Sequence, residues 1–115
     1  MQMAVELQGD VYIVRLRDAK MTYPGLASFF SAVRQLVEDG GRKLVFDFGQ
    51  VSYIDSASIG CLMDIHRLLK DKSGAMKLAA LQPRVETMLS MTGVHKIIEI
   101  HREEALALQA FAAGA

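Results

Sequence analysis

The chain has 115 residues, 51% of them hydrophobic, which is enough for one folded domain over residues 1–115 with a single core. Its 13 basic and 13 acidic residues balance to a formal net charge of zero, so the composition gives no reason to expect binding to nucleic acid or to an anionic membrane. The sequence has neither the roughly 20 consecutive apolar residues that span a bilayer nor the charged start and apolar run of a signal peptide, so membrane insertion is not expected.

Two β-rich segments, residues 4–7 and 11–16, come first along the chain. Gly9-Asp10 joins them, and because glycine adopts positive φ at little cost, the sequence predicts a β-hairpin. A helix is expected after Pro24, where apolar side chains recur at helical spacing, and Gly40-Gly41 ends it. Its apolar stripe consists of Leu26, Phe29, Phe30, Val33 and Val37.

Strands and helices alternate through the rest of the chain. Residues 44–48 form an almost continuous apolar run, typical of a strand covered on both faces, and a short second apolar run precedes a polar break at residues 55–58. The helix that opens at this break ends at Gly74. Its expected buried arc contains Ser58, Cys61, Leu62, Ile65, Leu68 and Leu69.

Four further elements complete the predicted order. They are a strand at residues 76–81, a helix from Pro83 to Gly93, a strand at residues 96–101 and an alanine-rich helix that opens at Glu103 and Glu104. The order β-β-α-β-α-β-α-β-α predicts an α/β fold, because strands that alternate with helices pair in parallel through right-handed crossovers. We therefore expect a mixed, mostly parallel sheet of about five strands.

The sequence offers no catalytic or metal centre. Residues 56–60 resemble the nucleophile elbow of hydrolases only in part, since that motif requires a glycine two residues before its serine and Ser56 occupies that place. The three histidines and Cys61 are scattered and lack the short ligand spacings of zinc sites. We expect a protein that is not an enzyme and that needs no metal and no cofactor.

Cys61 is the only cysteine, so no internal disulfide can form. This usage fits a reducing compartment, and we expect a cytoplasmic protein. Its place on an apolar helix face predicts a small core residue rather than a reactive thiol.

The polar break carries Asp55, Ser56 and Ser58 at the start of a helix. Aspartate and serine are favoured there because their side chains accept hydrogen bonds from free backbone N–H groups, so helix capping is one interpretation. The same N–H groups and the positive end of the helix dipole accommodate a phosphate, so a second interpretation is a place where charge is added or removed. The residues alone leave both interpretations open.

The segment 47–60, Asp-Phe-Gly-Gln-Val-Ser-Tyr-Ile-Asp-Ser-Ala-Ser-Ile-Gly, is similar to the signature of STAS domains, the fold of bacterial anti-sigma factor antagonists. The resemblance extends through residues 74–79, 85–89 and 91–94, and so over nearly the whole chain. It implies a sheet with helices packed mainly on one side. It also implies that Asp47 forms hydrogen bonds to nearby backbone and fixes the loop that follows.

The resemblance further implies a function in partner switching. The unmodified protein would bind an anti-sigma factor, a serine kinase of the histidine-kinase-like ATPase class, and a phosphatase would reverse its phosphorylation. ATP belongs to the kinase, and the sigma factor is freed when its inhibitor is sequestered. The implied partner-binding residues are Ser52, Tyr53, Asp55, Ser56, Ala57, Ser58 and Gly60, together with the helix that follows.

The family's phosphorylated serine or threonine lies in this loop, but the sequence departs from the pattern there. Aligning Asp55 with the motif aspartate places Ala57 at the usual acceptor position and Ser58 at the motif glycine. Some relatives in stress-signalling assemblies carry the acceptor directly after the aspartate, which is Ser56 here. At about 100° per residue, Ser58 projects into the buried arc and Ser56 towards the polar side. We expect Ser56 to be modified, with Ser58 as the second choice.

Alanine at the usual acceptor position also supports an alternative within the family. The chain would then be a non-phosphorylated scaffold subunit of a stress-signalling assembly or of a lipid-transport ABC complex. Such a subunit binds a partner ATPase without being modified.

Overall fold

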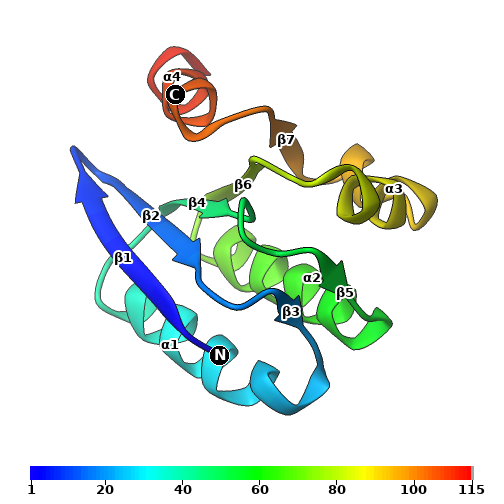
Figure 1. Ribbon diagram of the computed structural model, residues 1–115. Helices are drawn as coiled ribbons and strands as arrows, with labels where there is room; N and C mark the ends of the chain where they lie inside the picture. The colour runs from blue at the N-terminus through cyan, green and yellow to red at the C-terminus, as the bar shows by residue number, and fades with distance from the viewer. Residues whose placement is uncertain (115) are drawn as a thin grey trace.

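The main sheet has five strands of mixed direction, as expected from the sequence (Figure 1). The computed structural model describes residues 1–114, so Ala115, the last residue of the expected domain, lies outside the described residues. The strands are β1 (Met3–Gln8), β2 (Val11–Leu16), β4 (Lys43–Asp47), β6 (Ala75–Ala79) and β7 (Glu99–His101). They lie in the order β1-β2-β4-β6-β7, with β1 antiparallel to β2 and the other neighbours parallel. The predicted hairpin is confirmed, with Gly9 at a φ of 61°.

Three helices cover one face of the sheet and a fourth covers the other (Figure 1). The helices α1 (Leu26–Glu38), α2 (Ser56–Asp71) and α3 (Pro83–Met91) bury side chains in the larger core cluster. The last helix, α4 (Glu104–Gly114), packs on the opposite face. The predicted arrangement, with helices mainly on one side, is therefore confirmed. None of the helices formed by residues 1–114 has the length and hydropathy required to cross a membrane.

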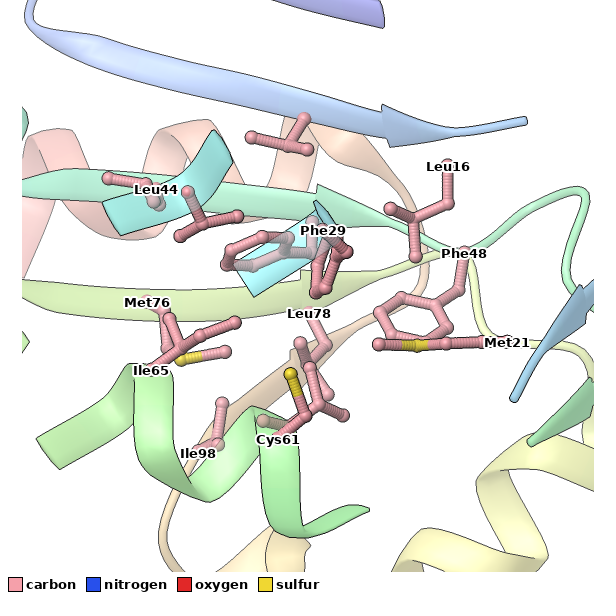
Figure 2. Close-up of a cluster of buried hydrophobic side chains, with 14 of the residues drawn as sticks. Leu16, Met21, Phe29, Leu44, Phe48, Cys61, Ile65, Met76, Leu78 and Ile98 are labelled. Carbon is pink, nitrogen blue, oxygen red and sulfur yellow. The ribbon is translucent and has the colours of Figure 1, made fainter. Parts of the chain in front are cut away.

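Alternation along the central strands divides their side chains between two core clusters. In β4, Leu44 and Phe46 point into the larger cluster, whereas Val45 points towards α4. A strand covered on both faces must be apolar on both, which explains the continuous apolar run that the sequence displays there. Figure 2 shows the larger cluster, in which Leu16, Met21, Phe29, Leu44, Phe48, Cys61, Ile65, Met76, Leu78 and Ile98 are labelled.

Two parts of the strand pattern differ from the prediction. The strands β3 (Lys20–Met21) and β5 (Tyr53–Ile54) pair in parallel as a separate two-stranded sheet, where the sequence indicated only a short apolar run at the second of them. The strand expected at residues 96–101 begins only at Glu99, because Val94–Lys96 form a 3-10 turn, η2, after Gly93 enters it with a φ of 81°.

The strand β6 also ends earlier than predicted, at Ala79 rather than at residue 81. Ala80 has a φ of 63°, a left-handed conformation in which an extended strand cannot continue. The turn that results brings the side-chain amide of Gln82 to within 3.0 Å of the Gly49 carbonyl oxygen, which accepts its hydrogen bond. The loops after β4 and β6 are thus joined.

A charged cluster fastens α4 to the sheet. The Arg15 guanidinium donates to both carboxylate oxygens of Glu104, at 2.7 and 2.8 Å, and lowers the pKa of that carboxyl to about 2. Burial raises the pKa of the neighbouring Asp47 carboxyl. Asp47 Oδ1 also accepts a hydrogen bond from the Gly49 N–H at 2.7 Å, so the expected hydrogen bonding to the following loop is confirmed.

The fold predicts that Leu62→Ala destabilises the protein by roughly 2–5 kcal/mol, because Leu62 is fully buried between α2 and the sheet and truncation leaves a cavity. Urea unfolding measures this free energy. Lys70→Ala, at an exposed position of the same helix, is the matched control and should change it by less than about 0.5 kcal/mol. A small loss for Leu62→Ala would contradict the assigned helix face.

Candidate functional site

The Asp55 carboxylate organises the start of α2. Asp55 is the N-cap residue, and its Oδ1 accepts a hydrogen bond from the Ser58 N–H at 2.9 Å and lies 2.7 Å from Ser58 Oγ. Its Oδ2 accepts the Tyr23 N–H at 2.9 Å. The Ser58 hydroxyl, followed by these backbone N–H groups, lowers the pKa of the Asp55 carboxyl, because each donor favours the ionised form. The capping interpretation of this aspartate is therefore confirmed.

Ser58 is fully buried. Its Oγ lies 2.5 Å from the Met21 carbonyl oxygen and 2.7 Å from Asp55 Oδ1. A hydroxyl has one proton, so Ser58 donates to one of these two acceptors at a time. A kinase could reach this oxygen only after the first turn of α2 had moved away from β3.

Ser56, the first residue of α2, is exposed. It lines a shallow cavity of about 200 Å³ between α2 and α3, together with Ile59, Met88, Met91 and Thr92. Met91 is 82% exposed, so the far wall of this cavity is an apolar side chain open to solvent. The two serines of the loop thus differ in access, with Ser56 on the surface and Ser58 in the core.

A second and larger groove lies on the other side of the first turns of α2. It has a volume of about 490 Å³ and separates α2 from α1 and the preceding 3-10 turn η1 (Tyr23–Gly25). Tyr23 is 73% exposed at its rim. The lining residues are Tyr23, Pro24, Leu26, Ala27, Phe30, Ala57, Gly60, Cys61 and Asp64.

The remaining residues of the loop predicted to bind a partner do not all line these two hollows, because Ser52 and Tyr53 lie outside both. Ser52 is exposed, and both its N–H and its hydroxyl donate to the Ala19 carbonyl oxygen, at 2.8 and 3.2 Å. Tyr53 is half-buried under the Arg84 guanidinium, whose Cζ lies 5.4 Å from the ring centroid. Ala57 and Gly60 line the larger groove.

Gly60 has neither a steric nor a conformational need to be glycine. A Cβ atom built there meets no atom within 4 Å, and the residue lies inside a helix with no positive φ. A glycine in a helix costs roughly 0.5–1 kcal/mol relative to alanine. Within residues 1–114, neither the space around Gly60 nor its backbone conformation therefore requires a glycine there.

The predicted burial of Cys61 is confirmed. Cys61 is buried and faces the core, and burial raises the pKa of its thiol to about 11, so the thiol stays protonated at neutral pH. Among residues 1–114, no group of three or more histidine, cysteine, aspartate or glutamate side chains is placed to hold a metal ion.

Another cavity lies at the opposite end of the parallel strands. It has a volume of about 390 Å³ and is lined by Lys43 and Glu99, the first residues of β4 and β7, by Lys77 in the middle of β6, and by Gly114 of α4. Its buried cation is already paired, because Lys77 Nζ lies 2.8 Å from a Glu99 oxygen and 4.6 Å from the Phe111 ring centroid.

A profile of the STAS domain family matches residues 2–107. The chain belongs to the STAS domain family. The anti-sigma F factor antagonist of Paenibacillus polymyxa is 29% identical to this STAS domain over 65 residues, which make up 56% of each chain. The match spans 56% and 65% of the lengths of two curated relatives.

Solved structures share the fold across almost the whole STAS domain. An anti-sigma-factor antagonist (STAS) domain protein from Planctomyces limnophilus has a TM-score of 0.87 at 18% identity, covering 96% of this chain and 97% of that one. The anti-sigma factor antagonist SpoIIAA in its unphosphorylated form has a TM-score of 0.73 at 16% identity, covering 96% and 98%. The phosphorylated form of SpoIIAA, a Bacillus cell fate determinant, has a TM-score of 0.74 at 15% identity, covering 96% and 99%.

The sequence did not indicate the groove residues of η1 and α1. Tyr23, Pro24 and Phe30 lie about 30 residues before Ala57 in the sequence, and only the folded chain brings them beside Ala57 and Gly60. Tyr23 was the one available signal for the groove. It is a large side chain beside Pro24, ahead of the apolar stripe of the helix, and it has no core position to fill there.

The Asp55 hydrogen bonds predict a pH-dependent stability that Asp55→Asn removes. A lowered pKa stabilises the fold above the unfolded-state pKa of about 3.9, and this stabilisation is lost as the pH falls through the folded-state value. An amide has one acceptor oxygen and cannot replace both carboxylate oxygens. Urea unfolding at a series of pH values should show Asp55→Asn less stable at neutral pH, with the difference narrowing below about pH 4.

Asp71→Asn, which removes an exposed carboxylate from the last residue of α2, is the control for this comparison. It should produce a much smaller difference at every pH. Equal behaviour of the two variants would contradict the role of Asp55 as the anchor of the loop.

Proposed function

We propose that this STAS domain is an anti-sigma factor antagonist that acts in the bacterial cytoplasm by binding and has no catalytic activity of its own. In the unmodified state it binds an anti-sigma factor, a switch kinase of the histidine-kinase-like ATPase class, through the loop Ser52–Gly60 and α2. Phosphorylation of Ser56 ends this binding, and a phosphatase restores it. The name of the Paenibacillus relative supports the class of partner, and the two forms of SpoIIAA support regulation by phosphate.

One observation carries the proposal: an exposed hydroxyl lies at a helix start between two apolar hollows. Ser56 faces the cavity formed with α3, and the groove beside α1 opens on the other side of the same helix turn. Apolar surface flanked by polar groups is typical of a protein interface, and exposed Tyr23 and Met91 are the kinds of residue that contribute most to one. A phosphate charge on Ser56 therefore lies next to both hollows of the proposed binding surface.

The modification is a transfer of the γ-phosphoryl group of ATP. Ser56 Oγ bonds to the γ-phosphorus, the bond from that phosphorus to the ADP oxygen breaks, and the serine proton passes to a base of the kinase. The product carries about −1.5 to −2 additional charges at neutral pH. In a desolvated interface this charge is unfavourable unless a partner cation pairs with it, so the complex dissociates.

A constitutive scaffold is the second candidate function. Two observations favour it, because Ala57 occupies the usual acceptor position and the next serine, Ser58, is fully buried. The same surface would then bind a partner ATPase without modification. Incubation of the chain with the partner kinase and ATP, followed by measurement of its mass, distinguishes the two functions.

Under the proposal, Ser56→Ala keeps partner binding and abolishes phosphorylation, whereas Ser56→Asp weakens binding. The weakening is partial, because an aspartate carries less charge and fewer acceptor oxygens than a phosphoserine. Calorimetric titration with the partner kinase measures the affinity, and mass spectrometry after incubation with ATP locates the phosphate.

Ser90→Ala, at an exposed serine of α3, is the control and should change neither result. Phosphate mapped to Ser58 would contradict the choice of acceptor. With a kinase of demonstrated activity, a chain that remains unmodified would support the scaffold.

Gly60→Ala separates folding from binding. It should raise the free energy of unfolding by roughly 0.5–1 kcal/mol, since the methyl meets open space and alanine favours the helix. The same methyl projects into the groove and should weaken partner binding several-fold. Asp71→Ala, about 16 Å further along α2, should leave binding unchanged. Unaltered affinity for Gly60→Ala would place the partner elsewhere.

A further inference from the structure

One cation near the site is engaged only by an aromatic ring. The Arg84 guanidinium rests over Tyr53 at 5.4 Å, and Arg84 is exposed at the start of α3. The ion pairs formed within residues 1–114 do not include it. An exposed cation–π contact is worth only about 0.5–1 kcal/mol, so a full anionic charge within reach competes with the ring.

The periodicity of α3 places Arg84 on the same helix face as the residues that line the cavity with Ser56. Arg84, Met88 and Met91 are spaced at i, i+4 and i+7, so they lie on one face of the helix. Met88 and Met91 form the wall opposite Ser56 in the small cavity, while Arg84 contacts Tyr53, which precedes Ser56 in the loop. Along the axis of α3, Arg84 therefore lies about one helical turn, or about 5.4 Å, before Met88, which lines the cavity with Ser56. Figure 1 shows α3 beside β5 and the start of α2.

The negative charge of Asp55 favours a cation beside a phosphate at this point. Asp55 adjoins Ser56, and its two oxygens are engaged by Ser58 and Tyr23, so it stays as a fixed negative charge. Lys20 pairs in register with Tyr53 in the small sheet and is the other cation close to the loop. Arginine matches phosphate geometry better than lysine, because its planar fork donates two parallel hydrogen bonds.

We propose that Arg84 is the internal receptor for a phosphate on Ser56, exchanging the Tyr53 ring for the phosphate oxygens when Ser56 is modified. This inference rests on the proposed function. The exchange uncovers Tyr53, draws the guanidinium across the cavity between α2 and α3, and holds the modified loop in one conformation. Modification then changes the shape of the binding surface as well as its charge, and α3 becomes the element that reports the state of Ser56.

The test uses a full-length chain with phosphoserine installed at position 56 during translation, so no kinase is needed. Phosphorus NMR follows the second ionisation of the phosphate, whose ordinary pKa is about 6. Arg84→Gln should raise this pKa by about 0.5 or more. A closely paired cation lowers the pKa of an acid by about 1–3, and an exposed arginine lowers it by less. Arg84→Lys should give an intermediate value, because it retains the charge and loses the fork.

Arg67→Gln is the matched control, since it removes an arginine from an exposed position about 16 Å further along α2. It should leave the pKa of the phosphate unchanged. A pKa that does not move in Arg84→Gln, or that moves equally in Arg67→Gln, would overturn the proposal. Urea unfolding of each variant checks that the fold is retained. Whether the kinase modifies Ser56 at all is decided separately, by the mass measurement on the unmodified chain.

Discussion

The hydrogen bonds of the Asp55 carboxylate are the interaction on which the start of α2 depends. They join the first turn of α2 to the turn η1, two segments more than 30 residues apart, through the N–H groups of Ser58 and Tyr23. Of the two hollows beside α2, one has η1 as a wall and the other begins at the capped turn. A neutral side chain of similar size cannot hold both partners, which gives a physical reason for an aspartate here.

The capped turn also separates the two serines. Successive helix positions differ by about 100°, so Ser56 and Ser58 point in nearly opposite directions from the same turn. One hydroxyl meets solvent and the other closes the junction between α2 and β3. A chain with alanine between them therefore retains one accessible hydroxyl in this loop.

Periodicity made most of the fold predictable, because buried arcs and glycine stops are local properties of the sequence. Ser58, Cys61 and Leu62 are buried as their spacing indicated. The pair β3 and β5 was not predictable, since two-residue strands are too short to show alternation. The groove beside α1 and the contact of Arg84 with Tyr53 arise between distant segments, and no pattern within either segment encodes them.

The position of Met1 determines where the protein can be immobilised for a binding measurement. Its amino nitrogen lies 3.3 Å from Ser28 Oγ, and its side chain packs beside Gly25, at the edge of the groove that begins with Tyr23. A tether joined before Met1 would emerge next to the proposed interface and compete with a partner for it. Gly114 lines the cavity at the opposite end of the sheet, so immobilisation from that side leaves the face around Ser56 open (Figure 1).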